Sequence, residues 1–216
     1  MEELTALWPQ GLHGAAPADS LLNAVHQARP TGRREYGLLP TKVHTNLRVF
    51  PAPHESEPDY IPLLLGANLL TTGYLWDQIR AKGGAYGCSL LCRPPLALLH
   101  AHDDPHCQQT FQVFQGLRQH LRENPFTSQD VDRAILQTLG PYLTPRRPAE
   151  AASLCLNTLK RDITNETRAQ FFEKVQRTTP QEVNQALDTL LLSGGNDCAL
   201  GPAPAPADFT PFPLPL

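Results

Sequence analysis

The sequence predicts an α+β domain in which helices cover one face of an antiparallel sheet. Three patterns support this fold class. Residues 42–50 alternate like a strand, residues 59–79 form a long helical pattern that leads into two short β-like runs, and later residues form successive helical patterns that end in one more β-like run. A chain of 216 residues is long enough to bury a sizeable core.

The two ends of the chain are predicted to lie outside this domain. Residues 1–37 are mostly small and polar around one short helical pattern, which is typical of a connector. The first 25 residues lack Arg and Lys, so we expect no secretory signal or transit peptide there. Residues 202–216 are rich in proline, which cannot donate ladder hydrogen bonds. We therefore expect a domain over residues 38–201 and a proline-rich tail after it.

A strand and one principal helix open the domain. Alternate residues give the strand at residues 42–50 one fairly apolar face: Val43, Thr45, Leu47 and Val49. A loop rich in proline and acidic residues follows at residues 51–58. Apolar residues then recur at helical spacing over residues 59–79, through the weak helix formers Gly66 and Gly73. This pattern predicts a helix of roughly five turns.

A hairpin and a series of helices complete the predicted domain. Residues 85–92 and 96–102 are predicted strands, joined by a turn in which two prolines restrict the backbone. Helices are expected at residues 107–122, 128–139, 150–160, 166–177 and 180–192. The last helix begins with an N-cap threonine, a proline and a capping-box glutamate, a strong start signal: Thr179, Pro180 and Glu182. A glycine pair ends it, and residues 197–200 can add a final strand.

Composition argues against several classes of function. The 18 Lys and Arg residues are outnumbered by 21 Asp and Glu residues, and the net charge of -3 disfavours a nucleic-acid partner. No apolar run reaches the roughly 18–20 residues of a membrane span, so we expect no membrane partner. The 5 cysteines lack CxxC spacing, which favours reduced thiols in a reducing compartment over disulfides or a zinc cage.

One segment, residues 75–87, carries functional information. Arg80 ends the long helix, and two glycines after it allow the backbone to turn sharply. Tyr86 opens the next strand, so its phenol and the Arg80 guanidinium can converge. The alternative is a purely structural helix end, in which Arg80 and Lys82 complement the helix dipole and Gly83 supplies a left-handed cap. A phosphate-binding loop is disfavoured, because the glycines follow a helix and no Gly-Lys-Ser/Thr step is present.

This segment resembles the Arg-x-Lys-Gly-Gly-Ala-Tyr-Gly motif in the last domain of the presequence protease group of M16 (pitrilysin/insulinase-like) metallopeptidases. Three further stretches resemble the same domain: a strand that ends in an Asp-Pro step at residues 96–105, a helix start at residues 126–132 and a closing strand at residues 198–202. The resemblance covers residues 38–203 and implies the M16 peptidase-like (LuxS/MPP-like) α+β fold.

The resemblance also implies a function. In this family, four homologous α+β domains form two halves that close around a peptide, and the first domain holds zinc through His-x-x-Glu-His and a distal glutamate. The last domain lends an arginine and a tyrosine that contact the substrate near the scissile bond. By resemblance these are Arg80 and Tyr86, which would bind the peptide backbone and stabilise the tetrahedral intermediate. The substrate loop between them would consist of Lys82, Gly83, Gly84 and Ala85.

The chain departs from the whole-family pattern in one respect. No His-x-x-Glu-His occurs in its 216 residues, so it lacks the family's zinc ligand pair and general-base glutamate. We therefore expect a non-zinc domain without a cofactor of its own, inactive alone, whose partners are a zinc-bearing N-terminal half and a short or unfolded peptide substrate. The resemblance implies a mitochondrial matrix, plastid or bacterial cytoplasmic location. The alternative is a catalytically inactive peptide-binding or assembly subunit of the same fold.

Other polar clusters are expected to be structural. His100 and His102 would share one strand face, near His106, Asp103 and Asp104. A strand end before a proline turn is ordinarily polar, and no third metal ligand can be assigned. Three further pairs are expected to be interior thiols, acids at a helix start and a solvated turn, respectively: Cys88 and Cys92, Asp130 and Asp132, and Arg146 and Arg147.

Overall fold

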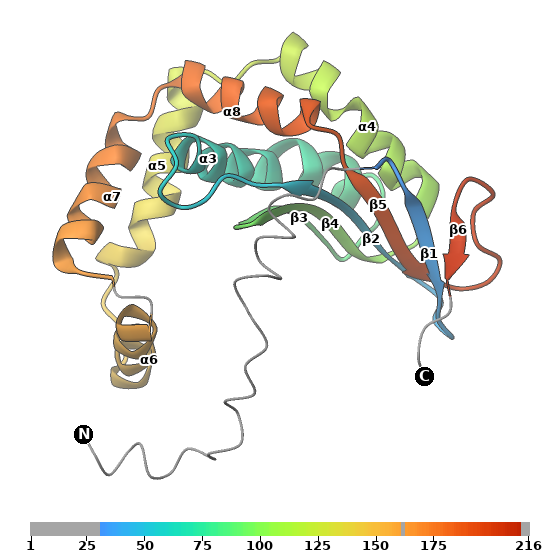
Figure 1. Ribbon diagram of the computed structural model, residues 1–216, viewed down its shortest axis with the longest axis horizontal. Helices are drawn as coiled ribbons and strands as arrows, with labels where there is room; N and C mark the ends of the chain where they lie inside the picture. The colour runs from blue at the N-terminus through green and yellow to red at the C-terminus, as the bar shows by residue number, and fades with distance from the viewer. Residues whose placement is uncertain (1–30, 161–162, 213–216) are drawn as a thin grey trace.

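The computed structural model describes residues 31–160 and 163–212, which form one sheet with helices over one of its faces (Figure 1). Within these residues, the 6-stranded sheet has the order β3-β4-β2-β5-β1-β6. The strands are Arg34–Leu38 (β1), His44–Pro51 (β2), Gly87–Arg93 (β3), Leu96–Asp104 (β4), Asn196–Gly201 (β5) and Thr210–Phe212 (β6). The predicted α+β fold is therefore confirmed.

Strand pairing changes direction across the sheet. The strands β3, β4, β2 and β5 pair antiparallel, as predicted. At the other end β1 runs parallel to both of its neighbours, β5 and β6. The expectation of a wholly antiparallel sheet is wrong there, because the partners of β1 lie at the far end of the chain and no turn signal announces such distant pairing.

The helical segments are α3 (Tyr60–Leu70), η1 (Thr71–Ala81), α4 (Cys107–Glu123), α5 (Ser128–Leu143), α6 (Pro148–Lys160), α7 (Asn165–Arg177) and α8 (Pro180–Leu192). In Figure 1, α3, α4 and α8 lie over one face of the sheet, and the opposite face carries no helix of the described residues. The helices α5 and α7 lie beyond one end of the sheet, and α6 lies farther out (Figure 1). None of the described helices is both long and apolar enough to span a bilayer.

The core lies between the sheet and its helical layer. Helix α3 is buried on most sides because it contacts β3, α5 and α8. Its Leu65 is fully buried, and Phe111 of α4 extends the same core. A Cβ on Gly66 would lie 2.7 Å from the Cδ1 atom of Leu187, so this glycine allows α3 and α8 to approach closely.

Strand β2 places polar residues beneath the helices. Asn46 is fully buried, and Arg48 donates a hydrogen bond of 2.6 Å to the buried carboxylate of Asp197. Leu47 and Val49 alternate with these residues, so they lie on the helix-free face, where they are half-buried. The alternating apolar residues of β2 therefore lie on the face of the sheet that has no helices. The face covered by helices carries polar and ion-paired residues of this strand.

Both predicted boundaries of the domain are wrong. Strand β1 crosses the first boundary: its residues 34–37 belong to the predicted connector, yet Tyr36 is fully buried in the core. Residues 202–212 return to the sheet, where Phe209 is 6% exposed and β6 pairs with β1. Proline is tolerated here because β6 lies at the edge of the sheet. The rest of the predicted connector and tail, residues 1–30 with their short helix and residues 213–216, lies outside the described residues.

Candidate functional site

The predicted site lies where the principal helix ends. The last part of that helix, η1, is π-helical, and the Lys82 amide donates to the Asp77 carbonyl five residues back at 3.0 Å. The chain then turns, and the Gly84 amide donates to the carbonyl of Arg80 at 3.0 Å. The next residue, Ala85, is 3% exposed and donates its amide to the Ile79 carbonyl at 3.1 Å, which fixes the start of the path into β3.

The two glycines of the turn are required for different reasons. Gly84 has φ of +78°, in the left-handed region that favours glycine. A Cβ on Gly83 would lie 2.5 Å from the carbonyl oxygen of Ile79, so Gly83 is needed for close packing. The expectation that Gly83 supplies the left-handed cap is therefore wrong, because the wider π-helical turn moves that conformation one residue on.

This turn brings Arg80 and Tyr86 together, as the motif predicts. The central carbon of the Arg80 guanidinium lies 5.7 Å from the centroid of the Tyr86 ring. The same carbon lies 4.0 Å from the centroid of the Trp76 ring, one helical turn earlier. Tyr86 is 68% exposed and Trp76 is 46% exposed, so the cluster faces solvent.

Arg80 differs from its neighbour Lys82 in its ion pairing. Within residues 31–160 and 163–212, no carboxylate lies within ion-pair distance of its guanidinium. The carboxylate of Asp77 instead binds the Lys82 ammonium at 2.7 Å. Lys82 therefore closes the helix end, as the structural alternative requires, whereas the Arg80 guanidinium lies within cation–π distance of two aromatic rings.

Tyr86 also contacts strand β4. The ring of His102 lies edge-on to the phenol, with 5.6 Å between centroids, and His100 stacks on His102 at 5.2 Å. Burial and the neighbouring His102 lower the pKa of His100, which favours its neutral form. The register between β3 and β4 creates the contact between His102 and Tyr86, so the sequence, which predicts a structural role for both histidines, does not reveal it.

Asp104, another member of the predicted polar cluster, has a structural role. Asp104 is fully buried, accepts a hydrogen bond of 2.8 Å from Asn46, and accepts others from Thr110 and the His106 amide. It therefore joins β4 to β2 and to the start of α4. In the described part of the chain, no three His, Cys, Asp or Glu side chains gather closely enough to hold a metal ion.

The cysteines near the site, Cys88 and Cys92, are half-buried and pack against the core, so their predicted interior position is confirmed in part. Burial raises the pKa of Cys88 to about 11, even though the nearby Arg80 opposes the shift, and it raises the pKa of Cys92 to about 12. Both thiols are therefore protonated at neutral pH and are poor nucleophiles.

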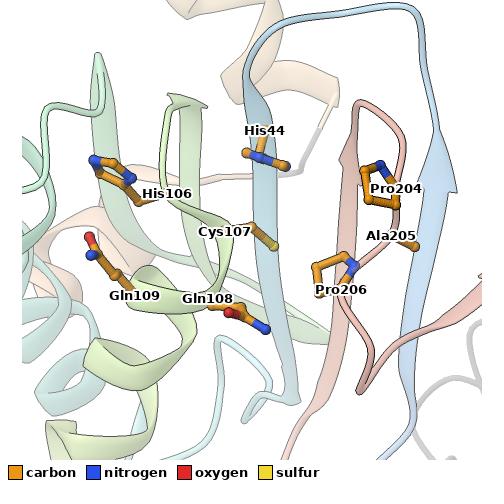
Figure 2. Close-up of a pocket in the computed structure, with 8 residues that line it drawn as sticks. All are labelled: His44, His106, Cys107, Gln108, Gln109, Pro204, Ala205 and Pro206. Atoms are coloured by element: carbon orange, nitrogen blue, oxygen red, sulfur yellow. The ribbon is translucent and has the colours of Figure 1, made fainter.

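A separate pocket of about 380 Å³ lies between the start of α4 and the loop after β5 (Figure 2). His44 on β2 lines it and lies 3.1 Å from the Tyr36 hydroxyl, and burial lowers the pKa of this histidine. Cys107, at the first turn of α4, has its pKa raised to about 12 by burial. The pocket therefore offers no activated thiolate for nucleophilic chemistry.

Comparison with known families decides the assignment of the domain. Residues 63–197, which include the whole Arg80 to Tyr86 turn, match the family model described as the PreP C-terminal domain. The chain belongs to this family. As a PreP C-terminal domain it is an M16 presequence-protease-like domain, as the motif predicts.

Curated relatives agree with this membership. The mitochondrial presequence protease of Danio rerio is 28% identical over 204 residues, which cover 91% of this chain and 19% of the relative. That of Mus musculus is 32% identical over 96 residues, which cover 44% of this chain and 9% of the relative. The PreP C-terminal domain described here thus spans about a fifth of the Danio rerio protein.

Solved structures share the fold at low sequence identity. An inactive M16 peptidase domain from Pseudomonas fluorescens has a TM-score of 0.63 and 17% identity, with 86% of this chain and 47% of that chain covered. Pitrilysin has a TM-score of 0.60 and 12% identity, with 84% of this chain and 22% of that chain covered. The PreP C-terminal domain therefore has the fold of M16 peptidase domains.

Proposed function

We propose that this chain is the substrate-contacting, non-zinc C-terminal domain of a zinc metalloendopeptidase that degrades short or unfolded peptides. The observation that carries the proposal is the exposed convergence of Arg80 and Tyr86, on a turn held by two glycines and without a carboxylate partner for the arginine among the described residues. The names of the curated relatives support the peptidase class.

The chemistry of the two side chains suits peptide hydrolysis. The zinc ion, held by another part of the enzyme, would supply activated water to attack the peptide carbonyl. As the carbonyl oxygen gains negative charge, the Arg80 guanidinium and the Tyr86 hydroxyl would donate hydrogen bonds to it. A donor placed at such an oxygen is worth roughly 3–4 kcal/mol in comparable sites. Arg80 and Tyr86 would also bind the substrate backbone.

The proposal requires a partner. The chain has no His-x-x-Glu-His, so its activity depends on an N-terminal half that carries the zinc site. Closure of the two halves would bring Arg80 and Tyr86 to the reacting carbonyl and exclude water. Because the curated relatives are named as mitochondrial proteins, we place the proposed enzyme in the mitochondrial matrix.

A second function is favoured by a different observation. A structural neighbour is described as an inactive M16 peptidase domain, and the present chain lacks the zinc motif. It could thus serve as a peptide-binding or assembly subunit without turnover. The two functions differ in whether Arg80 and Tyr86 affect the rate of cleavage or only the affinity for peptide.

Reconstitution tests the proposal. The Danio rerio protease without its matched C-terminal segment is mixed with this chain, and cleavage of a fluorogenic peptide is measured. We expect activity to appear, and Arg80→Ala or Tyr86→Phe to lower kcat by about 100-fold or more. Because both side chains are exposed, each substitution should change unfolding free energy by less than about 1 kcal/mol.

Arg93→Ala is the matched control, since Arg93 is an exposed arginine at the end of β3. Unchanged kcat in the Arg80 and Tyr86 variants would contradict the proposal. Peptide binding without any gain of cleavage would favour the assembly subunit.

A further inference from the structure

The Tyr86 ring contacts His102, a residue outside the motif that carries the proposed site. His102 on β4 lies directly opposite Gly87 on β3, the residue after Tyr86. A Cβ on residue 87 would come within 2.3 Å of the His102 Nε2 atom, so the imidazole lies over the bare backbone of Gly87. A cross-strand aromatic ring that covers a glycine in this way helps to fix the register of the two strands.

His102 is itself held in place. Its ring stacks on His100 with an interplanar angle of 19°, and its Nδ1 atom lies 3.6 Å from a carboxylate oxygen of Asp103. The Asp103 backbone is left-handed, with φ of 48°, and its carbonyl accepts the amide hydrogen of Tyr86 at 3.4 Å. The end of β4 therefore fixes both the backbone and one side of the ring of Tyr86.

The phenol needs such support to act at a substrate. Tyr86 is 68% exposed, and its hydroxyl has no hydrogen-bond partner among the described residues. A solvent-exposed ring can change rotamer within nanoseconds. A catalytic donor must stay within about 0.5 Å of its productive position, and a misplacement of about 1 Å can cost about 100-fold in rate.

We infer that His102 is a positioning residue, which holds the Tyr86 ring against Arg80 and so presents the phenol in one orientation. The inference rests on the proposed function of Tyr86. Four side chains form a chain of contacts with the Tyr86 ring, through cation–π, edge-on and stacked pairs: Trp76, Arg80, His102 and His100. Gly87 contributes to the same positioning, because a residue with a side chain there would fill the space that the His102 imidazole occupies.

The property required of residue 102 is a flat ring, and this separates positioning from simple stability. His102→Phe keeps a ring of similar width over Gly87, whereas His102→Ala removes it. Gly87→Ala acts on the same contact from the opposite strand, because its methyl group displaces the imidazole without changing residue 102. His106→Ala is the matched control, since His106 is an exposed histidine at the start of α4.

Nuclear magnetic resonance of the full chain with ring-labelled tyrosine tests the geometry without a partner. Currents in the adjacent rings should displace the Tyr86 ring-proton signals from free-tyrosine positions. His102→Ala and Gly87→Ala should move these signals toward the free values, whereas His102→Phe and His106→Ala should leave them displaced. Tyr86 signals that stay the same in His102→Ala would overturn the inference.

Kinetics in the reconstituted protease test whether cleavage slows when the Tyr86 ring is no longer held in place. His102→Ala should lower kcat by about 10- to 100-fold with KM changed less than threefold, and His102→Phe should recover most of the loss. Equal losses in the Ala and Phe variants would overturn the inference. If Tyr86→Phe itself left kcat unchanged, the proposed function would fail, while the resonance experiment would still decide whether His102 orients the ring.

Discussion

The left-handed backbone at Gly84 allows a quantitative test of how the turn is built. Gly84 has φ of +78°, and a Cβ there would meet only the Cγ atom of Pro105, at an ordinary contact distance of 3.6 Å. The cost of Gly84→Ala should therefore come from the backbone alone, at about 1–2 kcal/mol. For a domain of this size, that loss lowers Tm by about 2–8 °C.

A second glycine provides a control, because its replacement by alanine should raise the stability of the chain. Gly116 lies within α4, and a Cβ there would have no atom within 4 Å. Gly116→Ala should stabilise the chain by about 0.5–1 kcal/mol, because alanine loses less backbone entropy in a helix. Thermal unfolding followed by circular dichroism, together with urea titration, measures both variants. The reasoning is refuted if Gly84→Ala is neutral, or if the two variants shift Tm in the same direction.

Two other features give testable stability effects. Asp104→Ala should lower unfolding free energy by about 2–5 kcal/mol in a urea titration, because it leaves several buried donors unpaired; a loss below about 1 kcal/mol would contradict this. Asp130 and Glu182 accept backbone hydrogen bonds in their capping boxes, which holds the pKa of each below its ordinary value, 3.8 and 4.5 respectively. A depressed folded-state pKa adds stability above the unfolded pKa, so the urea midpoint should fall as pH drops from about 5 toward 2. Replacing the N-cap threonines, Thr127 and Thr179, with alanine should flatten that pH dependence, and an unchanged profile would contradict the assignment.

Local signals in the sequence predicted the parts of the fold that depend on neighbouring residues. The start of α8 is confirmed: Thr179 and Glu182 form the predicted capping box. The sharp turn after Arg80 is confirmed, because two adjacent glycines give the backbone the conformational freedom that such a turn requires. Only the assignment of the left-handed residue is wrong, since the wider π-helical turn places it at Gly84.

Contacts between distant segments could not be predicted in this way. Strand β1 pairs with β5 and β6 near the other end of the chain, and the prolines around β6 concealed a strand that needs few ladder bonds at the edge of the sheet. The contact between Tyr86 and His102 depends on the register of β3 against β4. Likewise, burial of Asn46 and Arg48 beneath helices depends on charge partners elsewhere in the chain, so the polarity of β2 alone could not reveal its covered face.

The central claim is that Arg80 and Tyr86 bind the reacting carbonyl more tightly in the transition state than in the bound substrate. The most direct measurement compares, in the reconstituted protease, the Kd of a phosphinic peptide that mimics the tetrahedral intermediate with the Kd of the matching uncleaved peptide. We predict that Tyr86→Phe weakens the phosphinic peptide by about 100-fold and the uncleaved peptide by less than about threefold. Equal weakening of both peptides, or of neither, would contradict the account.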